Sequence, residues 1–112
     1  MKDNFKIVIN IKKLITYLDK VIINFPNKEK VLKDKISCTL YEILELTYLA
    51  NEIDERKSIQ KEIVVKIKMI DFYFKISCDK KYLSYKKYQK ISMHLLNILK
   101  GLYGWIRYEK VQ

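Results

Sequence analysis

Residues 84–110, SYKKYQKISMHLLNILKGLYGWIRYEK, decide the fold. Their apolar side chains recur at alternating steps of three and four, which places them in one seam along a helix: Tyr88, Ile91, Leu95, Ile98, Leu102 and Trp105. Ser84 is a suitable N-cap for this helix, and Leu83 is placed to pack against Tyr88 as a hydrophobic staple. Because a seam of this length is unfavourable in water, we expect the remaining chain to cover it.

Two glycines, Gly101 and Gly104, lie late in the same seam. Each costs about 1 kcal/mol relative to alanine inside a helix. We therefore expect the bare backbone to serve close packing or a bend near Trp105.

The three preceding segments are amphipathic as well. They cover residues 4–24, residues 28–52, and the stretch from a polar turn at 51–55 to about residue 79. Their inner seams are Ile7, Ile11, Leu14, Leu18 and Val21; Leu32, Ile36, Leu40, Ile43, Thr47 and Ala50; and Ile59, Ile63, Ile67, Ile70 and Phe74. Pro26 separates the first two segments, and Asn27 is a suitable cap for the second. This pattern predicts an all-α fold, an antiparallel up-down four-helix bundle.

Length and composition support this prediction. The 112 residues suffice for one domain spanning 1–112, and two glycines with one proline leave little turn material for an all-β fold. No apolar run approaches the roughly 20 residues that span a bilayer, and the N-terminus lacks a signal-peptide core. We expect a soluble, cytoplasmic protein without membrane contact.

The formal net charge of +10 is unevenly distributed. Residues 27–55 carry four lysines against seven acids, whereas the segments on both sides carry an excess of basic residues. Such a protein favours polyanions or an acidic partner surface. Lysine outnumbers arginine 21 to 2, however, so part of the charge also fits a composition bias.

Basic residues form rows on the outer faces of the predicted helices. Lys2, Lys6, Lys13 and Lys20 share the outer face of the first segment. The candidates for contact with nucleic acid or a partner lie later in the chain: Lys57, Lys61, Lys68, Lys75, Lys80, Lys81, Lys86, Lys90, Lys100 and Arg107. One interpretation of these rows is that apolar residues between the lysines stack on the bases of a nucleic acid. The simpler interpretation is that the lysine stems cover exposed apolar groups.

Several outward positions are apolar or aromatic. Tyr41, Tyr48 and Leu49 lie on the far side of the second segment, and Val65 and Phe72 lie among the lysines of the third. A solvated face does not need them, so a second contact surface is one interpretation. Single exposed tyrosines are also common in monomers.

The sequence carries no pattern for catalysis, a metal or a cofactor. His94 is the single histidine, and no Glu-x-x-His pair, Gly-rich phosphate loop or nucleophile elbow occurs. Cys38 and Cys78 are interpreted as reduced thiols in or near the core, with a disulfide as the alternative. We expect a protein that is not an enzyme.

Two stretches resemble the accessory variability determinant (Avd) proteins of diversity-generating retroelements. The first is Asn24-Phe25-Pro26 followed by LYEILEL at 40–46, and the second is LSYKKY at 83–88 followed by LKGLYGWI at 99–106. The family pattern has Phe-Pro before basic residues, a later Leu-Ser…Tyr, and a closing Gly-Gly-Trp-Ile. The resemblance covers nearly the whole chain.

The resemblance implies a noncatalytic four-helix bundle that assembles into a homopentameric barrel. Such a ring binds the retroelement's reverse transcriptase and nucleic acid (RNA or DNA) and supports mutagenic cDNA synthesis. Tyr41, Tyr48, Leu49, Val65 and Phe72 are then candidates for subunit contacts.

Two alternatives remain open from the sequence. Four-helix-bundle proteins encoded in ribosomal RNA intervening sequences share the fold and would act as RNA-associated binding modules. The other alternative is a purely structural helical adaptor whose positive charge reflects only a bias in amino-acid composition.

Overall fold

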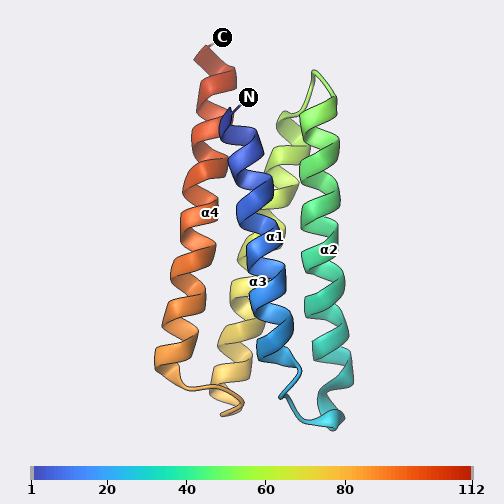
Figure 1. Cartoon of the computed structure of the whole chain (residues 1–112), viewed down its shortest axis with the longest axis vertical. Coiled ribbons are helices and arrows are strands. Elements are labelled where there is room, and N and C mark those ends of the chain that lie inside the picture. Colours follow the sequence, from blue (N-terminus) through green and yellow to red (C-terminus); the bar gives the residue numbers. More distant parts are fainter. Residues whose placement is uncertain (1, 112) are drawn as a thin grey trace.

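Figure 1 shows the computed structural model, which describes the backbone of residues 2–111 and the side chains of residues 6–108. The elements in chain order are α1 (Lys2–Ile22), a 3₁₀ turn η1 (Asn27–Glu29), α2 (Lys30–Glu52), α3 (Lys57–Asp79) and α4 (Tyr85–Val111). No strand occurs in the described chain. The predicted all-α bundle of four helices is therefore confirmed at the level of the single chain.

The helices alternate in direction and form an elongated bundle. Each long helix packs against two neighbours, so α1 contacts α2 and α4, and α3 contacts the same two helices from the opposite corner. The α1–α2 and α3–α4 connections lie together at one end, and both termini lie at the other (Figure 1). This topology makes the first and last helices neighbours.

The core consists of the predicted seams. Leu18, Ile43, Ile67 and Leu95, one residue from each helix, are at most 1% exposed and belong to one cluster of buried side chains. Seam residues near the helix ends, such as Val21 and Tyr88, are only partly buried and pack against that cluster. Fully burying one such aliphatic side chain contributes about 1.5–3 kcal/mol, so the seams supply the main driving force for folding.

Two predictions about helix starts have different outcomes. The backbone N–H of Lys87 donates to Ser84 Oγ at 3.0 Å, which confirms Ser84 as the cap of α4. The predicted cap at Asn27 is wrong, because neither η1 nor α2 begins with a side-chain capping hydrogen bond. A 3₁₀ turn forms instead, in which the Glu29 N–H donates to the Pro26 carbonyl at 3.0 Å.

The structure corrects one part of the glycine prediction, close packing, and one part of the cysteine prediction, the burial of Cys38. A Cβ at Gly101 would lie 3.6 Å from Ile7 Cγ1, an ordinary contact, and one at Gly104 would meet nothing within 4 Å. Packing within this chain therefore does not require a bare backbone at either position. Cys38 and Cys78 are free, but Cys38 is exposed because it lies on the outer side of α2.

Candidate nucleic-acid interface

The positive charge is concentrated on two neighbouring helices. Residues 6–22 of α1 and 85–108 of α4 carry nine basic residues and a single acid, Asp19, whereas residues 27–83 carry twelve basic residues and ten acids. The net charge is thus +8 on the α1 and α4 segments and +2 on the α2 and α3 part. α1 packs against α4, and Lys13, Lys87 and Lys90 lie at the seam between them. We call the surface of these two helices the α1/α4 face.

A groove of about 560 Å³ runs between α1 and α4. Its floor is apolar and consists of Leu14 and Ile98, which are both buried. Its walls are polar and combine cations, amides and rings: Asn10, Lys13, Tyr17, Lys90, His94 and Asn97. We call it the α1/α4 groove.

The aromatic side chains of the groove touch each other across the two helices. The rings of Tyr17 and His94 lie 5.6 Å apart between centroids with a tilt of 59°. Lys87 Nζ of α4 lies 5.5 Å from the centroid of the Tyr17 ring, a cation–π contact. The Tyr17 hydroxyl is buried and has no hydrogen-bond partner among the described residues.

The predicted basic candidates divide between this face and other parts of the bundle. Lys86, Lys90, Lys100 and Arg107 lie on α4 and are all exposed. The α3 row is the set Lys57, Lys61, Lys68 and Lys75, also exposed. Lys80 and Lys81 lie in the α3–α4 connection.

Some candidates have acidic partners. Lys75 Nζ lies 2.9 Å from Asp79 Oδ1, one turn later in α3, and this hydrogen bond raises the pKa of Lys75. Lys66, which was not a candidate, binds Glu42 of α2 at 2.8 Å. By contrast, Lys13 and Lys90 form no ion pair within the described chain. The groove lysines are therefore more available to an anion than Lys75 is, and Lys57, Lys61 and Lys68 are likewise exposed without an ion pair in the described chain.

Sequence reasoning missed Lys13, Tyr17 and His94 as members of one site. The lysine row of α1 follows from helical periodicity, but the sequence does not indicate that it lies beside α4. Only the adjacency of α1 and α4 brings these residues together, because they lie at opposite ends of the chain.

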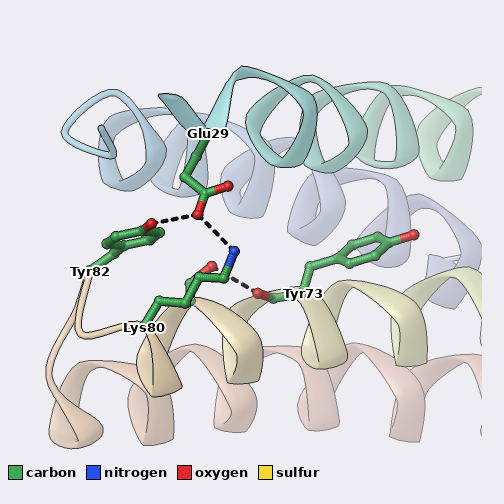
Figure 2. A network of polar contacts seen from close by, with 5 residues as sticks. Glu29, Tyr73, Lys80 and Tyr82 are labelled. Atoms are coloured by element: carbon green, nitrogen blue, oxygen red, sulfur yellow. Dashed lines mark hydrogen bonds and ion pairs between the residues drawn. The ribbon is translucent and has the colours of Figure 1, made fainter. Parts of the chain in front are cut away.

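A polar cluster at the end of the bundle fixes the two connections (Figure 2). Glu29 of η1 accepts hydrogen bonds from Lys80 Nζ at 2.8 Å and from the Tyr82 hydroxyl. These two donors, Lys80 first, hold the pKa of the Glu29 carboxyl below its usual range, and the same carboxylate raises the pKa of Tyr82. The cluster holds Lys80 in the α3–α4 connection against η1.

The motif residues Phe25, in the α1–α2 connection, and Trp105, in α4, are structural. Phe25 is 3% exposed, and its ring lies 5.6 Å from that of Tyr82 and 6.4 Å from that of Phe74. Trp105 is likewise 3% exposed, with the Arg56 guanidinium 5.8 Å from its ring. The Phe-Pro and Trp-Ile motifs therefore stabilise the bundle.

The candidate subunit contacts are all exposed: Tyr41, Tyr48 and Leu49 on α2, and Val65 and Phe72 on α3. Of these five residues, Tyr48 forms a cation–π contact within the described chain, with Lys12 Nζ 5.4 Å from the centroid of its ring. Together they place apolar area on the exposed surfaces of α2 and α3, and none of them lines the α1/α4 groove.

Two other kinds of site are absent from the described residues. They contain no group of three or more His, Cys, Asp or Glu side chains that would hold a metal ion. None of the described helices has a stretch long and apolar enough to cross a membrane.

Fold and charge define a basic four-helix-bundle protein whose net positive charge lies mostly on its first and last helices. The chain belongs to the bAvd-like family, whose model matches residues 5–109. A search of curated proteins and a search of solved structures found no match. The bAvd-like family is of an accessory, noncatalytic type, and the match favours it over the intervening-sequence alternative.

Proposed function

We propose that this chain is the accessory protein of a diversity-generating retroelement. It binds the element's reverse transcriptase and nucleic acid and supports mutagenic cDNA synthesis without catalysing a step itself. The observation that carries this proposal is the match of the bAvd-like family over residues 5–109.

The distribution of charge supports a nucleic-acid partner. The α1/α4 face has nine basic residues and one acid, so phosphates that bind there meet almost no repulsion. A protein that neutralises phosphates releases condensed counterions, so its affinity falls steeply with salt. We assign the nucleic acid to this face.

The α3 row suits a protein partner better. Its lysines alternate with the exposed Val65 and Phe72, and an interface core combines apolar groups with a polar rim. We assign this surface to the reverse transcriptase or to a neighbouring subunit. In a pentamer, five chains of +10 give a ring of about +50, which attracts RNA from a distance.

Co-purification tests the proposal. The chain is co-expressed with the reverse transcriptase of the same element, and the mass of the free protein is measured by light scattering. We expect the polymerase to co-purify, and the free protein to have the mass of five 13.6 kDa chains. Replacing Lys57, Lys61 and Lys68 by glutamine should release the polymerase, whereas replacing Lys30, Lys33 and Lys35 of α2 removes the same charge and should retain it.

A monomer that binds neither the polymerase nor RNA contradicts the proposal. The neighbouring genes provide an independent test, because a reverse transcriptase with template and variable repeats belongs beside this gene. A location inside a ribosomal RNA gene would support the intervening-sequence alternative instead.

A further inference from the structure

The Tyr17 hydroxyl is the feature of the α1/α4 groove that packing leaves unexplained. It is buried, it lines the groove, and no described residue accepts or donates a hydrogen bond to it. Buried polar groups are normally satisfied by protein, ordered water or a ligand, because an unpaired one is destabilising. The hydroxyl therefore has unused hydrogen-bonding capacity beside the groove.

The walls of the groove define the charge of that ligand. Lys13 enters from α1 and Lys90 from α4, and neither has an acidic partner in the described chain. No acidic residue lines the groove. Two unpaired ammonium groups on opposite walls favour an anion between them, and a phosphate is the anion that lysine commonly binds as a point charge.

The remaining wall residues suit a planar group with a polar edge. Tyr17 and His94 present two rings 5.6 Å apart, and both ring types stack on unpaired bases. Asn10 and Asn97 are exposed, and each amide offers both donors and an acceptor, as a base edge requires. The volume of about 560 Å³ lies within the range of about 300–1,000 Å³ typical of small-molecule sites.

We propose that the α1/α4 groove binds one unpaired nucleotide of single-stranded RNA. Lys13 and Lys90 hold its phosphate, His94 and Tyr17 receive its base, and the two asparagines bind the base edge. A duplex is excluded because its bases are paired and stacked, so none reaches the space between two helices. This inference rests on the proposed function, since it specifies how the basic face binds nucleic acid.

Fluorescence anisotropy with a labelled 12-nucleotide oligouridine and with a 12-base-pair RNA duplex tests the inference. For wild type we expect tighter binding of the single strand than of the duplex. His94→Ala should weaken binding of the single strand about 5-fold or more, the usual loss when one stacking partner is removed. Tyr17→Phe removes only the hydroxyl and should weaken it about 2- to 10-fold.

The salt dependence separates the two kinds of contact. Replacing Lys13 and Lys90 together by glutamine should lower the slope of log affinity against log salt by about 0.7, the value for the one phosphate of a single strand that both lysines hold. His94→Ala and Tyr17→Phe should leave this slope unchanged. Gln89→Ala on α4 is a matched control, because Gln89 is exposed outside the groove, and this variant should bind as wild type does.

Thermal unfolding of each variant establishes that it is folded. The inference is overturned if wild type binds RNA with a normal salt slope while His94→Ala and Tyr17→Phe bind as tightly as wild type. That result leaves the proposed function intact. Absence of any RNA binding by wild type overturns both.

Discussion

Lys81 adopts a left-handed backbone conformation, which is strained for a residue with a Cβ. Its φ is 67°, and no other non-glycine residue of the described chain has a positive φ. The Tyr82 N–H donates to the Ser77 carbonyl at 2.9 Å and the Lys81 N–H to the Cys78 carbonyl at 2.9 Å, the pair of bonds that defines a Schellman motif at the end of α3. Glycine usually occupies this position because a Cβ is strained there.

We predict that Lys81→Gly stabilises the protein by about 1 kcal/mol, since the left-handed conformation costs an L-residue about 1–2 kcal/mol. Urea unfolding monitored by circular dichroism measures the change. Lys61→Gly is the matched control, because that lysine is exposed within α3 and should lose about 1 kcal/mol. Destabilisation by both variants would show that the turn does not require a left-handed residue.

At the scale of elements, the two connections at one end of the bundle behave as one unit (Figure 2). Glu29 belongs to the α1–α2 connection, whereas its donors Lys80 and Tyr82 belong to the α3–α4 connection. Phe25 packs beneath them against Tyr82. The helix pairs are thereby joined through a charged contact as well as through the core.

This contact predicts a pH dependence with a definite sign. The pKa of Glu29 in the folded protein lies below its unfolded value, so between those values the unfolded state binds more protons. The stabilisation is complete above the unfolded value of about 4.3 and is lost as the pH falls through the folded one. Glu29→Gln should therefore melt below wild type at pH 7, and the two melting temperatures should converge in acid.

Glu45→Gln is the control for this prediction, because Glu45 is an exposed residue of α2 with no ion pair in the described chain. Melting temperatures by circular dichroism from pH 7 to pH 3 provide the comparison. An equal difference between Glu29→Gln and wild type at every pH would show that the carboxylate charge is not responsible.

The helices were predictable because each carries a seam with a period near 3.6, and burying those seams dominates the energetics. Residue-level features that depend on neighbours were not. Asn27 looked like a cap, yet the chain begins α2 through a 3₁₀ turn that orients Glu29 toward the other connection. Cys38 looked like a core thiol, and it lies on the outer side of its helix.

The candidate site was only partly predictable for the same reason. Lysine rows follow from helical periodicity, so the basic residues of α4 were identified. The groove also needs Tyr17 and His94, which meet only because the topology places the first helix beside the last. Nothing in the local sequence around either ring indicates the other.

At the scale of the whole molecule, the bundle separates two kinds of surface. The α1/α4 face holds most of the net charge, whereas α2 and α3 carry nearly balanced charges. Exposed apolar residues occur on both halves, for example Tyr41 and Phe72 on one and Met93 and Leu96 on the other. Such a division allows one side to bind a polyanion while the other packs against protein. The uneven charge follows from the order of the segments along the chain, because seven of the thirteen acidic residues lie within residues 27–55.

The salt dependence of RNA binding tests the central claim, that the α1/α4 face binds nucleic acid, most directly. For the single-stranded oligouridine, replacing Lys13, Lys87 and Lys90 together by glutamine should lower the slope of log affinity against log salt by at least about 0.7, the value for the one phosphate that Lys13 and Lys90 hold. The same substitutions at Lys30, Lys33 and Lys35 of α2 remove an equal charge and should leave the slope nearly unchanged. Equal reductions by both triple variants, or a wild-type affinity that does not respond to salt, would contradict the account.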